Sequence, residues 1–332
     1  MASAVAGASV LVTGGAGYIG SHCCKLLSRA GYAPTVFDNL STGNARAVRW
    51  GPLVEGDVRD TNLLARTLDE LRPEAVIHFA ASAYVGESVA NPGKYYANNV
   101  GGMISLLEAC LLAGVKRIVF SSSCATYGVP EVVPITEATA QCPVNPYGRT
   151  KLIGENMLAD HAAAHGLSYV ILRYFNACGA DLEGEIGEWH DPETHLIPRA
   201  LMAALDRSPA LEIYGSDYAT PDGTCVRDFV HVTDLARGHL QALSYLLASG
   251  KNATINLGSG HGHSILEVIA AIERITGKEV PVNFRPRRAG DPPILVADTS
   301  KAKATLGFAT EYSSLDAIIR TALPSIASKS AL

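Results

Sequence analysis

Long apolar runs are missing from this sequence of 332 residues. No uninterrupted run approaches the roughly 18 residues of a membrane span, so we expect no transmembrane helix. The first ten residues also lack the basic start and the cleavage pattern of a secretion signal. Net charge is low, because 27 basic residues nearly balance 32 acidic ones and leave −5. We therefore expect neither nucleic acid nor a membrane surface as a partner.

Metal-binding and disulfide patterns are also missing. The seven cysteines form no CxxC pair and no metal-ligand spacing, which is typical of reduced thiols in a cytoplasmic protein. Cys23 and Cys24 are neighbours in a predicted helix, and Cys110 lies in an apolar helix. His261 and His263 have no third ligand at a usual spacing, so we interpret them as solvated loop histidines and predict no metal site.

What the chain has is enough apolar sequence for a large core. Hydrophobic residues make up 48% of it, and its length favours about two domains. No internal repeat or low-complexity linker interrupts it. Over the first half, apolar strands alternate with helical segments, which is typical of a parallel, doubly wound α/β sheet.

The most informative stretch is VLVTGGAGYIGSH, residues 10–22. An apolar strand at residues 8–12 leads into Gly14, Gly17 and Gly20, and a helical pattern follows over residues 23–30. Glycines in such a turn let the backbone approach a pyrophosphate, and the helix amides then face its oxygens. An ordinary strand–helix turn could carry the same glycines, so the context decides between the two.

Asp38 supplies that context. It ends a second apolar strand, residues 34–37, and stands 18 residues after Gly20. A carboxylate at this place accepts hydrogen bonds from an adenosine ribose and repels a 2′-phosphate. Residues 39–45 contain no basic side chain. The sequence therefore predicts NAD rather than NADP. Asp57 lies near the end of the next predicted strand, residues 53–58. It either contacts the adenine of the cofactor or is solvated.

Two further strands, residues 75–81 and 117–120, follow, with a long helix predicted over residues 95–114 between them. The second strand opens into a run of serines that ends at Ser123. At the carboxyl end of a parallel strand these hydroxyls lie where ligands bind.

Tyr147 and Lys151 begin the next predicted helix as YGRTK. Their spacing of four residues puts both on one helix face. A nearby ammonium should lower the pKa of the tyrosine, which could then take a proton from an alcohol while a nicotinamide takes the hydride. An amphipathic helix with an exposed lysine is the alternative for this motif alone. The dinucleotide turn and the serine-ended strand favour catalysis.

The second half reads as a smaller, interrupted domain. Its predicted elements are a helix at 195–207, a strand at 211–214, a strand at 228–232 that returns to the main sheet, a helix at 233–247 and a strand at 254–257. Residues 179–194 are weakly patterned, acidic and predicted to be a loop. Ser264 and Glu267 form a capping box that opens a helix ending at Gly277.

Arg227 and Arg288 are candidate anion ligands in this half. Guanidinium groups are always charged, and their donors suit the oxygens of a diphosphate. The alternative is a pair of loop arginines that bridge to the neighbouring Asp228 and Asp291.

The motifs resemble those of a known family. They are TGGAGYIGSH, FDN, GDVRD, HFAASAYVGES, SSSCATYG, NPYGRTK, RYFN, DGTCVRDFVHV and RRAGD. This set is similar to the extended short-chain dehydrogenases/reductases and, among them, to the UDP-glucose 4-epimerases, over residues 10–306. The resemblance implies a tightly held NAD, an isomerase of carbohydrate (galactose) metabolism that interconverts UDP-glucose and UDP-galactose through a 4-keto sugar, and a homodimer.

The same resemblance implies the site residues. The catalytic residues are Tyr147, Lys151 and Ser123, and all three also contact the cofactor. The remaining cofactor contacts, beyond the three glycines of the turn, are Tyr18, Ile19, Asp38, Asn39, Asp57, Val58, Phe79, Ala80, Asn98 and Phe175. The substrate contacts are Asn176, His195, Leu196, Tyr214, Arg227, Arg288, Asp291 and Leu295, with Leu295 at a gate beside the sugar.

The chain departs from the familiar pattern at two positions. Ala83 stands where the enterobacterial sequences carry a lysine, so a cofactor contact is missing or comes from another group such as Tyr84. His195 replaces the usual asparagine.

The division implied is an NAD-binding Rossmann domain at 7–177, with a return segment at about 226–260, and a nucleotide-sugar domain at 178–225 and 261–328.

Other functions stay open at this stage. A pentose 4-epimerase acting on UDP-xylose and UDP-arabinose, or an enzyme for both sugar sizes, shares these motifs. A nucleotide-sugar dehydratase would need an acidic pair after Ser123, where the chain has Cys124, Ala125 and Thr126. A silent NAD-binding scaffold would need no base at Tyr147.

Overall fold

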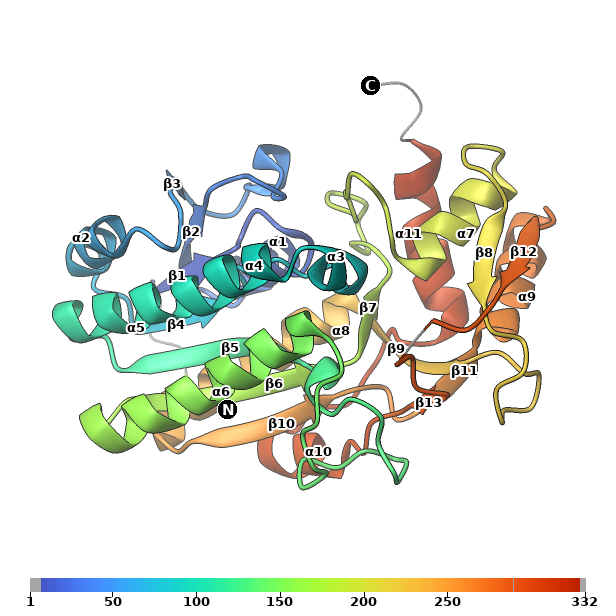
Figure 1. Cartoon of the computed structure of the whole chain (residues 1–332). Helices are drawn as coiled ribbons and strands as arrows, with labels where there is room; N and C mark the ends of the chain where they lie inside the picture. Colours follow the sequence, from blue (N-terminus) through green and yellow to red (C-terminus); the bar gives the residue numbers. More distant parts are fainter. Residues whose placement is uncertain (1–6, 289, 329–332) are drawn as a thin grey trace.

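The computed structural model describes residues 7–288 and 290–328. Its larger part is a seven-stranded parallel sheet in the order β10-β6-β5-β4-β1-β2-β3 (Figure 1). The strands are β1 (Ser9–Thr13), β2 (Ala33–Asp38), β3 (Leu53–Glu55), β4 (Ala75–His78), β5 (Arg117–Ser123), β6 (Ser168–Tyr174) and β10 (Ala253–Leu257). The chain leaves β1 towards β3 and then returns to build the other half from β4. This reversal confirms the doubly wound fold, and it places a ligand crevice beside the carboxyl ends of β1 and β4.

Helices cover both faces of this sheet. On one face lie α1 (Tyr18–Arg29), α8 (Val232–Ser249) and α10 (Ser300–Leu306); on the other lie α2 (Thr61–Leu71), α5 (Gly101–Ala113) and α6 (Pro146–His165), the last two drawn in front of the sheet in Figure 1. The residues of β1 alternate between two cores. Val10 and Val12 share one core with Leu27 of α1, and Leu11 shares the other with Leu64 of α2. Burial on both faces explains why these strands are apolar throughout.

The helix predicted over residues 95–114 begins earlier and changes its winding. It starts as α4 (Pro92–Tyr95), passes through the π-helical η2 (Tyr96–Val100) and continues as α5. Helix α3 (Val85–Ala90) precedes it, and the short 3₁₀ turns are η1 (Ala45–Ala47) and η3 (Cys124–Thr126). π-helical turns are frequent at functional sites, and this one carries Asn98.

The smaller part contains two short sheets and three helices. One sheet contains β7 (Asn176–Cys178), β9 (Val226–His231), β11 (Gly262–Ser264) and β13 (Ile294–Leu295), and the other pairs β8 (Leu211–Tyr214) with β12 (Val282–Arg285). The helices are α7 (Leu196–Ala204), α9 (Ile265–Thr276) and α11 (Leu315–Ala327). Their apolar faces form a separate core that includes Leu201, Ile272 and Ile318. The capping box of Ser264 and Glu267 is confirmed.

One predicted strand was placed in the wrong sheet. Residues 228–232 were expected to return to the main sheet, but they belong to β9, which pairs with β7, β11 and β13. The strand that returns is β10, which follows α8 and pairs with β6. An apolar pattern shows that a strand is buried, but it does not show which sheet the strand joins.

Cys23, Cys24 and Cys110 are buried and free, as expected. Within residues 7–288 and 290–328, no helix is both long and apolar enough to cross a bilayer.

Candidate active site

The glycine-rich turn joins β1 to α1 at the reversal of strand order. Gly14 has a φ of +72°, and a Cβ on it would lie 2.5 Å from the backbone nitrogen of Ala80. A Cβ on Gly20 would lie 2.2 Å from the carbonyl oxygen of Gly14. Helix α1 begins after Gly17 without a side-chain cap or an acidic residue in its first turn. Its first amides are therefore free to bind an anion, as the pyrophosphate of NAD requires.

Asp38 lies at the end of β2, directly beside this turn. Its carboxylate accepts hydrogen bonds from the backbone nitrogens of Ala16, at 3.0 Å, and Leu40, at 2.9 Å. Burial raises the pKa of Asp38, while these two hydrogen bonds act in the opposite direction. The carboxylate is thus held in one orientation at the place where the sequence puts the ribose contact.

Asn39 and Asp57 continue this edge of the site. Asn39 Nδ2 donates to Asp57 Oδ2 at 3.1 Å, and Arg59 forms an ion pair with the same carboxylate at 2.7 Å. The hydrogen bonds from Arg59, with Asn39 adding to them, hold the pKa of Asp57 well below its usual range. Asp57 is therefore an anchored carboxylate rather than a freely solvated one.

The other predicted cofactor contacts come from several elements around the same crevice. Phe79 and Ala80 follow β4, and both of their backbone nitrogens donate to the Thr13 carbonyl at the end of β1. Asn98 lies in η2 and donates to Asn99 Oδ1 at 3.0 Å. Phe175 follows β6 and is buried. Tyr18 and Ile19 open α1, and Val58 is buried beyond β3.

Ser123, Tyr147 and Lys151 gather at the carboxyl end of β5. Ser123 is the last residue of β5, and Tyr147 and Lys151 lie in the first turns of α6. The Lys151 ammonium donates to the Ser121 carbonyl at 2.7 Å and lies 5.8 Å from the centre of the Tyr147 ring. All three predicted catalytic side chains are buried.

The expected lowering of the pKa of Tyr147 by Lys151 was wrong. Burial raises the pKa of Tyr147 well above its usual value, and the hydrogen bond with Ser123 only partly opposes this. The lysine is buried as well, which lowers the pKa of Lys151 to about 7. A lysine that is partly uncharged near neutral pH and donates to a backbone carbonyl does little to stabilise the phenolate form of Tyr147.

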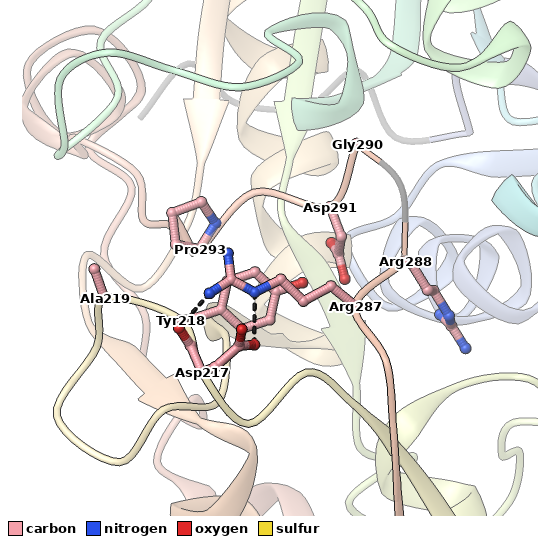
Figure 2. Close-up of a pocket in the computed structure, with 8 residues that line it drawn as sticks. All are labelled: Asp217, Tyr218, Ala219, Arg287, Arg288, Gly290, Asp291 and Pro293. Atoms are coloured by element: carbon pink, nitrogen blue, oxygen red, sulfur yellow. Dashed lines mark hydrogen bonds and ion pairs between the residues drawn. The ribbon is translucent and has the colours of Figure 1, made fainter.

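The predicted diphosphate ligands lie at the rim of the smaller part. Arg227 is in β9 and forms an ion pair with Asp291, which is the alternative that the sequence left open. Arg288 makes no ion pair with the described residues, and its guanidinium stacks 3.8 Å from the centre of the Tyr214 ring. Arg288 and Asp291 line a hollow of about 600 Å³ whose side chains Figure 2 shows.

Four other predicted substrate contacts surround this region. Asn176 in β7 donates to the Asp228 carbonyl at 2.9 Å, which ties β7 to β9. His195 occupies the N-cap position of α7 without a capping bond from its side chain, and Leu196 is the first residue of the helix. Leu295 pairs with Arg227 between β13 and β9, which brings the predicted gate next to a predicted phosphate ligand.

Ala83, where the familiar pattern has lysine, is exposed in the loop before α3. Tyr84 follows it, and its ring lies 5.9 Å from that of His190 and 6.4 Å from that of His195. The tyrosine therefore faces the loop at 179–195 that enters α7.

Sequence reasoning missed one group of side chains in that loop. Glu188, His190, Glu193 and His195 bring four potential ligand atoms within 4.8 Å of one another. The signal was present as ExHxxExH, but it matched no usual metal-ligand spacing and was treated as part of an acidic loop.

A glycine-rich turn after β1, a carboxylate at the end of β2 and a serine–tyrosine–lysine group at the carboxyl end of β5 are typical of the extended short-chain dehydrogenase/reductase class. The match to a family description is narrower: residues 10–258 match the NAD dependent epimerase/dehydratase family. The chain belongs to that family.

Its relatives agree over nearly the whole chain. A UDP-glucose 4-epimerase of Rhizobium leguminosarum bv. trifolii is 52% identical over 318 residues, which cover 96% of this chain and 97% of the relative. The structure of UDP-glucose 4-epimerase from Brucella ovis in complex with NAD is 63% identical, with a TM-score of 0.94 and coverage of 96% and 98%. That of Stenotrophomonas maltophila, with bound NAD and formylated UDP-arabinopyranose, is 41% identical, with a TM-score of 0.94 and coverage of 97% and 99%.

Proposed function

We propose that the chain is an NAD-dependent epimerase that interconverts UDP-glucose and UDP-galactose at C4. The observation that carries the proposal is the gathering of Ser123, Tyr147 and Lys151 at the carboxyl end of β5, on the sheet whose β1 ends in the dinucleotide turn. UDP-glucose 4-epimerases among its relatives support it over almost the full length.

Tyr147 is the acid and base of the proposed mechanism. Its phenolate oxygen takes the proton of the C4 hydroxyl as C4 is oxidised to a ketone, and returns it when the ketone is reduced from the other face. When bound, NAD supplies the acceptor and then the donor of the C4 hydride. Ser123 holds the reacting oxygen beside Tyr147, and Lys151, whose pKa burial lowers to about 7, adds to the positive charge that NAD would bring when bound.

Arg227 and Arg288 hold the diphosphate while the keto sugar turns over. Their guanidinium groups offer fixed donors to its oxygens. Arg227 must exchange or share its bond to Asp291, which then lies beside the ribose hydroxyls. Asn176, His195, Leu196 and Tyr214 are the proposed remaining contacts of the nucleotide.

The alternatives are weaker. A dehydratase needs an acidic pair after the strand-end hydroxyl, but η3 presents Cys124, Ala125 and Thr126 there. A pentose-acting enzyme remains the second candidate, because a solved relative that is 41% identical is described with formylated UDP-arabinopyranose. Enzymes discriminate against a missing small group by only roughly 10- to 200-fold, so we expect UDP-arabinose to be a second, slower substrate.

Incubation of the purified protein with UDP-galactose, UDP-N-acetylgalactosamine and UDP-arabinose tests this assignment. We expect the highest kcat/KM for UDP-galactose, with UDP-glucose as the product on chromatography. The N-acetyl sugar should be a poor substrate because forcing extra atoms against Leu295 costs roughly 1–3 kcal/mol, and Leu295→Ser should improve it. A wild type that prefers UDP-arabinose by more than tenfold, or that produces a dehydrated sugar, would overturn the assignment.

Replacement of Asp38 tests the choice of cofactor. We expect Asp38→Ala to lose NAD during gel filtration and to bind NADP better than the wild type, because the ribose loses its acceptor and the 2′-phosphate loses a repelling charge. Asp69→Ala, an exposed carboxylate at the end of α2, is the control and should keep its NAD. Equal NAD content in the two variants would count against the role of Asp38.

We propose the division of labour along the chain that the sequence suggests, except that β7 and β9 belong to the smaller part: NAD on 7–175 and 232–260, and the nucleotide sugar on 176–231 and 261–328. We also propose a cytoplasmic homodimer. Apolar side chains on α3 and α5 are exposed, among them Val89, Ile104 and Leu112, and a partner subunit would cover them. Sedimentation equilibrium that gives the mass of one chain would refute the dimer.

A further inference from the structure

Glu188, His190, Glu193 and His195 converge on one point in the loop between β7 and α7. Nδ1 of His195 lies 2.7 Å from Oε1 of Glu188, and Nδ1 of His190 lies 3.2 Å from the same oxygen. One ligand atom from each of the four residues lies within 4.8 Å of all the others. Donor atoms that surround a single ion have separations of this order, given metal–ligand distances of about 2.0–2.2 Å.

Three of these atoms are buried but make no hydrogen bond of acceptable geometry with the described residues: Oε1 of Glu188, Oε2 of Glu193 and Nδ1 of His190. The two glutamate side chains are only 4% and 6% exposed. Buried polar atoms are nearly always satisfied, so three orphaned atoms aimed at one point indicate an additional partner.

The backbone holds one of these carboxylates in place. The other oxygen of Glu193, Oε1, accepts hydrogen bonds from the backbone nitrogens of Thr194, at 2.9 Å, and His195, at 3.0 Å. These bonds fix the carboxylate plane and leave Oε2 facing the cluster. Such orientation of a ligand by its second atom is usual at metal sites.

Charge balance points the same way. The three carboxylates of the nearby acidic group, residues 181, 183 and 185, are paired with the cations Lys25, Arg29 and Arg49. Within the described chain, neither Glu188 nor Glu193 forms an ion pair with a lysine or arginine. Among the described residues, their only ion-pair partners are the two histidines, at 2.7–3.8 Å, and buried carboxylates are found where they are paired or coordinate a metal.

We propose that Glu188, His190, Glu193 and His195 bind one divalent transition-metal ion. Two imidazoles and two carboxylates suit Zn²⁺ or a similar first-row ion, whereas Mg²⁺ and Ca²⁺ prefer oxygen ligands alone. The proposal does not rest on the epimerase assignment, because none of the four residues supplies an acid, base or hydride, and only His195 is also a proposed contact of the nucleotide.

The ion would fix the conformation of the loop between β7 and α7, next to the proposed contacts of the nucleotide. Its ligands span the last eight residues of the loop, and the last of them, His195, occupies the N-cap position of α7. The rings of Tyr18 in α1 and Tyr84 before α3 each lie about 6 Å from His190, at 6.0 and 5.9 Å. A bound ion therefore fixes the loop against the first turn of the dinucleotide-binding helix.

Metal binding by the full-length, tag-free protein tests the proposal. After treatment with EDTA and dialysis, the wild type should take up about one equivalent of Zn²⁺ or Co²⁺ and show a higher Tm with Zn²⁺, because the ion binds only the folded state. The Co²⁺ form should show visible d–d bands without sulfur-to-cobalt charge transfer, which separates this site from the cysteines.

His190→Gln and Glu188→Gln are the test variants, and His261→Gln in an exposed loop is the matched control. The test variants should lose affinity by at least the roughly 10- to 100-fold seen on loss of a supporting group, and the control should bind as the wild type does. If Glu188→Gln fails to fold, His190→Gln decides. No uptake by the wild type, or equal uptake by a folded test variant, overturns the proposal and leaves the cluster a network of ion pairs.

Discussion

Tyr147→Phe is expected to lower the turnover of UDP-galactose by about 10²- to 10⁴-fold, the usual effect of losing a catalytic acid or base. The substitution removes one oxygen from a side chain that is 7% exposed, so the fold should persist. Because most of the proposed contacts to the nucleotide and the cofactor come from other residues, KM and NAD content should change little. Steady-state kinetics and the absorbance spectrum of the purified variant measure these quantities.

Tyr32→Phe is the matched control. Tyr32 is also buried, but it lies just before β2, at the end of the sheet away from the carboxyl edge. The same loss of a hydroxyl there should leave turnover unchanged. If Tyr147→Phe retains near-normal turnover while Tyr32→Phe behaves like the wild type, another group is the base.

The raised pKa of Tyr147 bears on this experiment. Burial favours the neutral phenol of Tyr147, so Tyr147 needs positive charge beside it to act as a base. Lys151 alone does not supply it, because its own burial lowers its pKa to about 7. Sequence reasoning assigned the two residues to one helix face correctly. It could not weigh burial against charge, since both depend on how deeply α6 packs on β5.

Local signals in the sequence predicted most of the fold. The glycines that end β1, the carboxylate that ends β2 and the serines that end β5 mark the carboxyl edge of the sheet, and topology then brings them together. Sheet membership was harder. The strand β9 is as buried as a strand of the main sheet, but its partners are β7, β11 and β13, and that choice depends on contacts between distant segments.

The substrate side depended even more on distant contacts. Arg227 and Asp291 are 64 residues apart, and their ion pair was only one of two alternatives in the sequence. The stacking of Arg288 on Tyr214 had no sequence signal. The cluster at 188–195 is local, but its spacing is unusual, and only the folded loop shows that four donor atoms face one another.

Disruption of a buried network of polar side chains between α6 and β6 should have the largest effect on stability. Arg173 in β6 and Glu155 in α6 form an ion pair at 2.6 Å, with side chains that are 7% and 5% exposed. Ser122 Oγ donates to Glu155 Oε1 at 2.5 Å, and Gln141 Nε2 donates to Oε2 at 3.0 Å. Arg173 also donates to the Tyr127 hydroxyl at 2.9 Å. The network thus joins α6, β5 and β6 with the segment that follows Ser123.

We expect Glu155→Gln to lower the free energy of unfolding by about 3–5 kcal/mol, the usual cost of leaving one partner of a buried ion pair without its counter-charge. The amide keeps the size of the side chain, so the loss reflects charge rather than a cavity. Asp316→Asn breaks an ion pair with Arg274 in which both side chains are about half exposed, at 44% and 57%. This control should leave the unfolding transition in urea where it is, because water screens such a pair.

Glu155 also lies one helical turn after Lys151, and its charge raises the pKa of that lysine against the larger effect of burial. Removal of the charge should lower the pKa of Lys151 further, so that less of the ammonium remains at neutral pH. Glu155→Gln should therefore need a lower pH than the wild type to keep the same fraction of charged lysine, and the alkaline limb of its kcat profile should move to lower pH. Asp316→Asn should keep the wild-type profile. A Glu155→Gln protein with the wild-type urea midpoint would show that Arg173 does not need the carboxylate as its partner. An unshifted kcat profile would show that the pKa of Lys151 does not depend on the charge of Glu155.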